Sequence, residues 1–303
     1  MDEPAAASLT TPADVAALAR GGAGLRRVGR DLWRRWVTDV RASTDARAAA
    51  ARAAVGTRAL DRGAAAVLVT TAVCLTATNF LAVGAEPGWL VSTLSTLGLD
   101  GIGARLERAL TVSDAAELNR LVFWALVQVA GYVVAPLLVV RFVLRGRASD
   151  VGLGARAVLR HGAPYLVLFA LALPLVVAAS YGSAFQAKYP FYDLSAGEGL
   201  WPRMWTWWAL YALQFVALET FFRGFLLHGL VPRLGYASLF VMIVPYNMIH
   251  YGKPMPEALA AIVGGLALGT LSLRTRSIWW GAGLHIAIAG TMDVLALWHA
   301  GVL

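Results

Sequence analysis

Among the ionisable residues in the apolar C-terminal third of the chain, four have types and positions that could support chemistry. Glu219 and Arg223 lie in the stretch LETFFRGFLLHG (218–229), four residues apart, which places both on one face of a helix. His250 ends the run VPYNMIH, and His285 lies within WWGAGLHIAIAG. Charge inside an apolar helix is costly, so these residues are candidates for function. A carboxylate and imidazoles together either bind a divalent metal or activate water as a general base.

Each of these residues also has a purely structural explanation. Glu219 and Arg223 would neutralise one another as an ion pair that fixes helix packing, and a lone buried histidine is often a satisfied core residue. At about 1.5 Å of rise per residue, however, Glu219, His250 and His285 all fall near the middle of the bilayer. We therefore predict that they share one internal cavity, with Glu219 as the base. If a metal such as zinc takes part, the same three residues are its ligands, and the alternative is a site without metal.

The composition places these residues in a membrane protein. The chain has 303 residues, of which 58% are hydrophobic and 15% charged, whereas a soluble domain usually carries about 25% charged residues. We expect an all-α, polytopic membrane bundle of about seven to eight transmembrane helices. The single cysteine, Cys74, excludes a disulfide or a cysteine-based metal site within one chain and is expected to be a packed or lipid-facing thiol.

Long apolar runs define the expected spans, since a helix needs roughly 20 apolar residues to cross the hydrocarbon core. Five runs are long enough, and two shorter ones are expected to be tilted, buried or incompletely spanning. The segment 88–110 is expected to be a loop with an interfacial helix. The long runs are 64–84, 121–143, 164–184, 206–230 and 277–298, and the short ones are 236–250 and 257–272.

Residues 1–62 form a basic, Ala/Arg-rich N-terminal extension without an apolar run, so no signal peptide is expected. Arginine also follows the second, fourth and sixth spans, which predicts a cytoplasmic N-terminus and an external C-terminus. Within the extension, 24–40 has apolar residues near helical spacing and arginines on the other side. It is either an amphipathic helix on anionic headgroups or a solvated helix packed on its own protein.

The motifs LETFFRGFLL, YNMIH and RTRSIWWGAGLH, in this order, resemble the CPBP (Abi, CAAX-type) family of intramembrane proteases, which includes the type II CAAX prenyl endopeptidases. The family pattern is Glu-Glu-x-x-x-Arg, then Phe-x-x-x-His, then His-x-x-x-Asn or Asp, on successive helices. By this resemblance Glu219 takes the second glutamate and Arg223 the arginine. Tyr246 takes the Phe position, and His250 and His285 take the histidines. The resemblance covers about residues 205–295.

Two positions depart from the family pattern. Leu218 replaces the first glutamate, to which the family assigns activation of water, and Ala289 replaces the Asn or Asp four residues after the last histidine. Neither side chain can accept a proton or support an oxyanion. Asn247, three residues before His250, is one substitute for the lost amide. Asp293 and His228 are others, although Asp293 lies toward the outer end and His228 near the inner end.

The domain division expected from these features is an extension (1–62), N-terminal transmembrane helices and loops (63–200) and a CPBP-like core (201–303). The resemblance implies an intramembrane endopeptidase that hydrolyses a peptide bond of a membrane-associated substrate, with activity reduced or lost through the two departures. The alternative is a catalytically inactive membrane binding or scaffold protein. The expected partners are the lipid bilayer and a membrane-associated or lipidated peptide, and no nucleic acid. The expected location is a bacterial cytoplasmic membrane.

Overall fold

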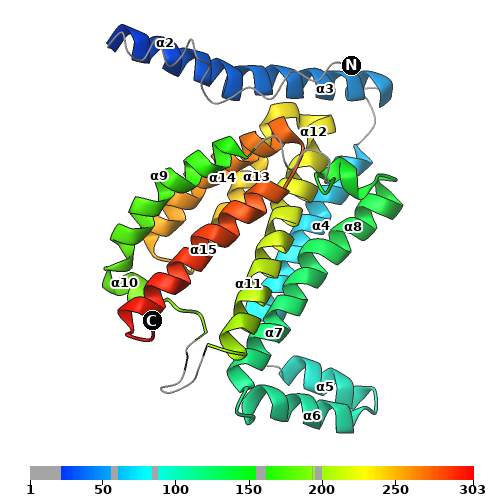
Figure 1. The fold of residues 1–303 in the computed structure, drawn as a ribbon. Coiled ribbons are helices and arrows are strands. Elements are labelled where there is room, and N and C mark those ends of the chain that lie inside the picture. Colours follow the sequence, from blue (N-terminus) through cyan, green and yellow to red (C-terminus); the bar gives the residue numbers. More distant parts are fainter. Residues whose placement is uncertain (1–21, 56–60, 84–87, 155–161, 193, 195–199) are drawn as a thin grey trace.

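The computed structural model describes residues 22–55, 61–83, 88–154, 162–192, 194 and 200–303, and these are helical apart from turns and connections. The chain forms a bundle with one pair of helices lying across one end and another pair at the opposite end (Figure 1). This confirms the all-α, polytopic fold class.

The apolar runs form the long helices of the bundle. The N-terminal ones are α4 (Arg62–Thr78) and the series α7 (Ala116–Val129), η3 (Ala130–Val134), α8 (Ala135–Leu138) and η4 (Val139–Val143). After α9 (Ala163–Ser180) and the short α10 (Ser183–Gln186) come α11 (Arg203–Glu219), η7 (Thr220–His228), α12 (Gly229–Leu234), η8 (Gly235–Ala237) and α13 (Ser238–Met248). The last two are α14 (Met255–Thr275) and α15 (Trp279–His299).

Six helical stretches in the described residues are long and apolar enough to cross a membrane. The count differs from the seven expected runs because 206–230 and 236–250 belong to one continuous helical stretch, Arg203–Met248. The chain reverses inside this stretch at Gly235, where φ is 58° and α13 turns back against η7. Positive φ favours glycine, since a Cβ there is strained. The run 257–272, expected to be short, is part of the 21-residue α14.

The outward faces of these helices suit a lipid environment. Large apolar side chains are exposed along every long helix, including Val69 on α4, Leu138 on α8, Leu171 on α9 and Val263 on α14. On a water-soluble protein a continuous belt of this kind would be unusual, whereas lipid tails cover it without cost. The chain is therefore an integral membrane protein. Cys74 is buried in the main apolar cluster, as a packed thiol.

The central helix of the bundle is the α11–η7–α12 series, and it carries Glu219 and Arg223. Its residues from Ala217 to His228 are all buried, because α7 and α15 flank α11 while α4, α8, α13 and α14 surround η7. The main apolar cluster joins four aromatic rings, from Tyr132, Phe221, Phe222 and Tyr246, in stacked and edge-on pairs. Glu219 and Arg223 are thus held by the most tightly enclosed helix of the molecule.

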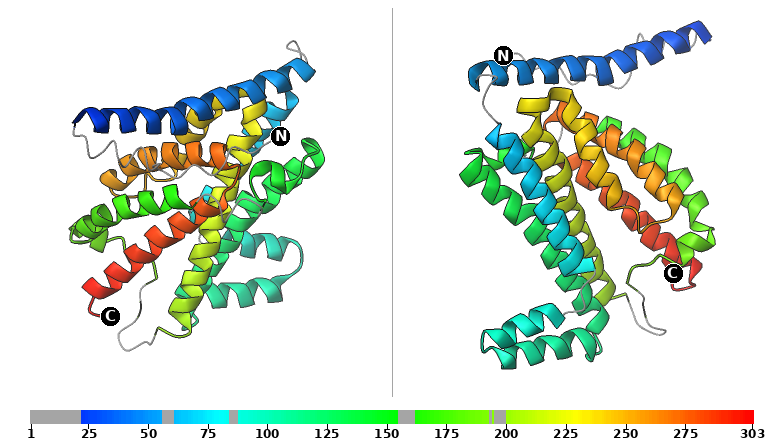
Figure 2. Two further views of the ribbon diagram at one scale, coloured as in Figure 1. Left: turned by 45° about the horizontal axis from the view of Figure 1, so that its top comes forward. Right: turned by 180° about the vertical axis from the view of Figure 1, so that it is seen from behind.

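The N-terminal extension includes α2 (Gly22–Trp33), η1 (Arg34–Thr38) and α3 (Asp39–Val55), which lie across one end of the bundle (Figure 2). Asp45 Oδ1 accepts a hydrogen bond from the Tyr236 backbone N at 2.8 Å, and Arg52 donates to the Arg233 carbonyl at 2.8 Å. The Arg274 guanidinium lies 4.3 Å from the centre of the Trp36 ring. The segment 24–40 therefore packs in part on its own protein, which agrees with the second of the two hypotheses, a solvated helix packed on the protein itself.

At the opposite end lie α5 (Gly88–Thr96) and α6 (Asp100–Thr111), which pack on one another and against the start of α7 (Figure 1). The prediction of a loop with one interfacial helix was therefore incomplete, since the segment forms a helical hairpin. Its turn uses Gly98 at a φ of 73°. Trp89, Leu97 and Ile102 remain exposed, which is the amphipathic character expected of an interfacial segment.

Two glycines let α14 approach α13, the helix that carries Tyr246. A Cβ built at Gly265 would collide with Ile243 and lie 2.9 Å from Tyr246 Cδ1, whereas one at the neighbouring Gly264 would meet nothing within 4 Å. Gly269, one turn further, lies against Leu239 in the same way. This is the close packing that small residues four apart permit between membrane helices.

We expect Gly265→Ala to lower the free energy of unfolding by about 1–3 kcal/mol, because overpacking forces the two helices apart. Gly264→Ala is the matched control and is expected to be neutral or slightly stabilising, since alanine has the higher helix propensity. Unfolding of both variants in mixed micelles measures the difference. Equal midpoints would show that α13 and α14 do not depend on this contact.

Candidate active site

Glu219 and Arg223 begin the site where α11 passes into η7, a nine-residue π-helix. A π-helix is rare, and short π segments inside α-helices are frequent at functional sites. Both side chains are fully buried, and Arg223 Nη1 lies 2.8 Å from Glu219 Oε1. The sequence-predicted ion pair is therefore present, and two opposite charges at this distance make one another tolerable in an apolar interior.

His285 joins this pair from α15. Its Nδ1 lies 2.9 Å from Glu219 Oε1, and its side chain is 17% exposed, whereas that of Glu219 is 1% exposed. The tautomer in which Nδ1 carries the proton and Nε2 is the acceptor fits this distance, because an ionised carboxylate can only accept hydrogen bonds. The Phe215 ring stacks on the imidazole with centroids 5.4 Å apart. Glu219 thus lies behind His285, and the imidazole is the more accessible of the two.

Tyr246 connects the two histidines. Its hydroxyl lies 3.2 Å from His285 Nε2, and its ring centre lies 4.0 Å from the Arg223 guanidinium carbon. Its backbone carbonyl is 2.9 Å from His250 Nδ1, and the two rings are 4.9 Å apart. The contacts therefore run from Arg223 through Glu219, His285 and Tyr246 to His250. They involve four helical elements, η7, α11, α15 and α13, and the turn after α13.

His250 belongs to this group only through Tyr246. It lies in the turn after α13, half-buried, and burial lowers the pKa of its imidazole, so the neutral form is favoured. Because the Tyr246 carbonyl accepts at Nδ1, His250 Nε2 is the free ring nitrogen. Glu219 and His285 are therefore in direct contact, and His250 is linked to them through Tyr246. That the three residues share one cavity stays a prediction.

Two of the three residues considered as substitutes have other partners. Asp293 is fully buried and accepts a hydrogen bond from Trp207 Nε1 at 3.0 Å. His228 Nε2 lies 3.1 Å from Ser272 Oγ. Asn247 Oδ1 is buried without a hydrogen-bond partner among the described residues. The contacts of Asp293 and His228 lie outside the Glu219–His285 group.

The two departures from the family pattern lie in apolar surroundings. Leu218 belongs to the main apolar cluster together with Phe222 and Tyr246. Ala289 belongs to a second cluster, with Trp207 and Tyr211 among its members. Both side chains are nearly inaccessible. A carboxylate at 218 would therefore enter a different environment from that of Glu219, although the two residues are adjacent.

The donor set does not fit a metal bound by Glu219, His250 and His285. Among the residues that the structure describes, no group of three His, Cys, Asp or Glu side chains is arranged to hold a metal ion. Glu219 Oε1 already lies within 3 Å of both Arg223 and His285. The guanidinium would repel a cation at that oxygen, and His250 is separated from it by Tyr246.

Phe215 and Gly281 support the site. The sequence indicated Gly281, as a small residue that lets backbones approach near His285, but Phe215 was missed. Phe215 lies four residues before Glu219, so helical spacing alone would have placed it on the same face. A Cβ built at Gly281 would lie 2.7 Å from Glu219 Oε2. Only a glycine on α15 lets the backbone approach the carboxylate this closely, which holds Glu219 against His285.

We expect Gly281→Ala to displace the Glu219 carboxylate and to lower the free energy of unfolding by about 1–3 kcal/mol. Gly283→Ala is the matched control on the same helix, since a Cβ there meets nothing within 4 Å. The thermal unfolding midpoints of the two variants in detergent provide the measurement. A Gly281→Ala midpoint equal to that of Gly283→Ala would mean that the close approach is not required.

Comparison with known proteins gives one match. Residues 200–291 match the family model described as "Type II CAAX prenyl endopeptidase Rce1-like". No curated protein and no solved structure matched the chain. The matched segment includes α11 to α14 and the first part of α15, and it contains every residue of the Arg223–Glu219–His285–Tyr246–His250 group. This match supports the assignment of residues 200–291 to the CPBP family of CAAX protease-type membrane proteins.

Proposed function

We propose that this protein is an intramembrane endopeptidase in which His285, rather than Glu219, is the general base. The observation that carries the proposal is the 2.9 Å contact between Glu219 Oε1 and His285 Nδ1, with His285 the more exposed partner. When the carboxylate holds Nδ1–H, Nε2 is the ring nitrogen that takes a proton from water, as in hydrolases that pair histidine with an acid. This arrangement needs no carboxylate at position 218.

In this mechanism a water molecule at His285 Nε2 attacks the carbonyl carbon of a membrane-associated peptide, and its proton passes to Nε2. Glu219 stabilises the resulting imidazolium, and Arg223 keeps Glu219 ionised in an apolar setting. The Tyr246 oxygen lies 3.2 Å from Nε2, so it accepts the hydrogen bond of the protonated ring. His285 then returns the proton to the leaving amine, as a general acid.

The test is cleavage of a fluorogenic farnesylated peptide by purified protein in lipid discs, with the same peptide lacking the lipid as a comparison. We expect the wild type to cleave and His285→Ala not to cleave. Leu218→Glu, which restores the family carboxylate, is expected to add little. If the wild type does not cleave the peptide and the Leu218→Glu variant does, the result would instead support a catalytically inactive protein.

Tyr246→Phe is expected to lower kcat by about 10–150-fold, because a hydrogen bond to a charged group contributes about 1.5–3 kcal/mol. The phenylalanine ring still covers Arg223, so the unfolding midpoint should change little. Comparison of kcat with KM tests this, since a residue that stabilises the imidazolium affects kcat. An unchanged kcat would exclude the hydroxyl from the reaction.

The alternative function is a catalytically inactive family member that binds a membrane-associated peptide without cleaving it. The burial of Leu218 and Ala289 in apolar clusters favours it, because both positions that the family fills with polar groups are closed by hydrocarbon. This reading predicts that the farnesylated peptide binds the wild type and His285→Ala equally, with no product from either.

We further propose that the end carrying α2 and α3 is cytoplasmic. Arg233, Arg274 and the arginines of the extension gather there in mutual contact, as shown by the Arg52–Arg233 and Arg274–Arg35 hydrogen bonds. The C-terminus lies at the other end of the bundle (Figure 1). The positive-inside rule then gives an external C-terminus. Cysteine labelling at Leu303→Cys in a Cys74→Ala background, from outside intact cells, tests this orientation.

A further inference from the structure

A basic pocket lies where the second long span ends, away from the candidate active site. It has a volume of about 460 Å³ and is lined by Leu137, Val140, Arg141, Arg145, Gly146, Arg147 and Ala148. The span Ala116–Val143 finishes just before four of these residues, Arg145 to Ala148. The pocket is therefore at the level where the hydrocarbon core meets the headgroup layer.

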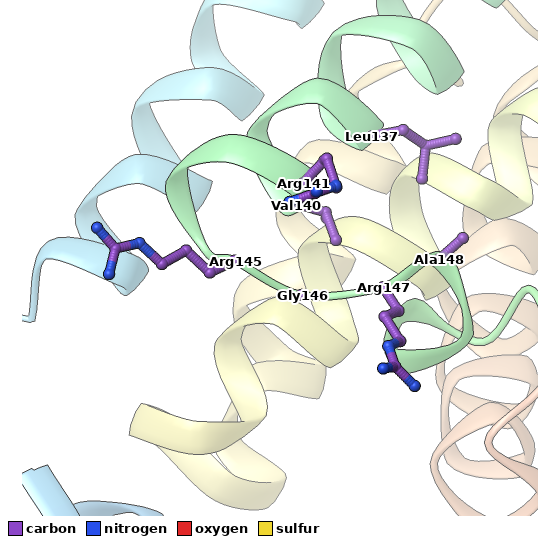
Figure 3. A pocket seen from close by; sticks show the side chains of 7 residues that line it. All are labelled: Leu137, Val140, Arg141, Arg145, Gly146, Arg147 and Ala148. Atoms are coloured by element: carbon purple, nitrogen blue, oxygen red, sulfur yellow. The ribbon is translucent and has the colours of Figure 1, made fainter.

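The three arginines line this pocket, and their side chains point in different directions. Figure 3 shows Arg145 and Arg147 leaving the loop in opposite directions, with Arg141 on the helix between them. All three are exposed, and none forms a salt bridge with another described residue. The nearest acid, Asp150, accepts a hydrogen bond from the Arg147 backbone N at 2.8 Å. The pocket thus carries a surplus of positive charge.

The backbone holds one of these arginines in an unusual conformation. Arg145 has a φ of 56°, in the left-handed region that favours glycine or asparagine. This turn brings the chain back so that Gly146 packs near Val140, at the floor of the pocket. The position therefore carries a long cationic side chain where the backbone alone would favour a small residue.

An apolar surface continues from the pocket into the hydrocarbon region. Val134, Leu138 and Phe142 are 49%, 51% and 69% exposed and follow one another at four-residue spacing, so they form a stripe along one face of the helix. At Phe142 the stripe reaches Arg141, whose guanidinium carbon lies 5.7 Å from the centre of the Phe142 ring. A ligand that fits both features has an acyl chain for the stripe and a phosphate for the guanidinium groups, which bind phosphate well.

We propose that this pocket binds the headgroup phosphate of an anionic phospholipid, whose acyl chain lies along the Val134–Leu138–Phe142 stripe. The site does not depend on the proposed protease function. A zwitterionic lipid has the same chains and phosphate, but its cationic headgroup opposes the arginines. A soluble phosphate ester has the charge without the chains. The zwitterionic lipid therefore tests the need for a net negative headgroup, and the soluble ester tests the need for acyl chains.

The test is native mass spectrometry of the detergent-purified full chain with dioctanoyl phosphatidylglycerol, dioctanoyl phosphatidylcholine and glycerol phosphate. The test variant is Arg141→Gln/Arg147→Gln. The control is Arg105→Gln/Arg108→Gln, which removes the same charge from α6 at the other end of the molecule. All four arginines are exposed, so both variants should fold.

We expect phosphatidylglycerol to bind most tightly and the test variant to lose about 30-fold in affinity, since each arginine near an anionic surface contributes about 1 kcal/mol. The control should keep the wild-type affinity, and Arg141→Lys/Arg147→Lys should recover part of it. Equal losses of affinity in the test and control variants would show that the net charge of the protein, and not this pocket, determines binding, which would overturn the proposal. Equal binding of the two lipids, or glycerol phosphate binding as tightly as phosphatidylglycerol, would overturn the proposal.

Discussion

Arg223→Met is expected to lower the free energy of unfolding by about 3–5 kcal/mol, because it leaves the Glu219 carboxylate buried with its cationic partner gone. Both members of the pair are fully buried, and the contact is 2.8 Å. His285 on the same carboxylate oxygen offsets only part of this loss. Chemical unfolding in mixed micelles, with wild type and variant at one pH, gives the comparison.

The chain offers a matched control with the same spacing. Arg41 and Asp45 are also four residues apart, but their side chains are 70% and 47% exposed and 3.7 Å apart. An exposed pair of this kind contributes about 0–1 kcal/mol, so Arg41→Met should have a small effect. The double variant Glu219→Gln/Arg223→Met should be more stable than Arg223→Met, because both charges are removed. An Arg223→Met variant no less stable than Arg41→Met would contradict the buried pair.

Glu219→Gln is expected to abolish most of the proposed activity, by about 10⁴-fold in kcat, as when the acid behind a catalytic histidine becomes an amide. The amide NH₂ of glutamine can donate to Nδ1, which moves the ring proton to Nε2 and removes the base. The measurement is single-turnover cleavage of the farnesylated peptide, normalised to folded protein, because the variant also leaves Arg223 unpaired.

The double variant Glu219→Gln/His285→Ala tests whether Glu219 acts by orienting His285 or acts independently of it. If Glu219 acts through His285, the double variant should be no slower than His285→Ala alone, since residues that act as a unit are not additive. A double variant slower than His285→Ala by the full factor of the Glu219→Gln change would mean that Glu219 acts independently, as the base that the sequence analysis expected. Activity of Glu219→Gln within tenfold of wild type would exclude both roles.

A carboxylate at position 219 has different neighbours from one at position 218, and this difference alters the proposed chemistry. Adjacent residues on an α-helix are rotated by about 100°, so Leu218 faces the apolar cluster while Glu219 faces Arg223 and His285. The family glutamate at 218 would have projected from another side of the helix. The absence of that carboxylate therefore does not remove the contact between Glu219 and His285.

Several features of this protein follow from the sequence alone. Apolar runs of sufficient length determine the membrane helices, because the bilayer offers the backbone no other hydrogen-bond partners. The four-residue spacing of Glu219 and Arg223 predicted their ion pair, and local helical geometry was enough for that. Family motifs then indicated His250, His285 and Tyr246. The helical hairpin of α5 and α6 was missed because short amphipathic helices lack a strong apolar signal.

Only the tertiary structure decided which groups meet. Whether His285 contacts Glu219 depends on the approach of α15 to α11, which Gly281 permits by lacking a Cβ. The π-helix after Glu219, the turn at Gly235 and the position of Tyr246 between the histidines have no local signature either. Spacing along one helix is set by covalent geometry, whereas contacts between helices depend on side-chain packing from distant parts of the chain.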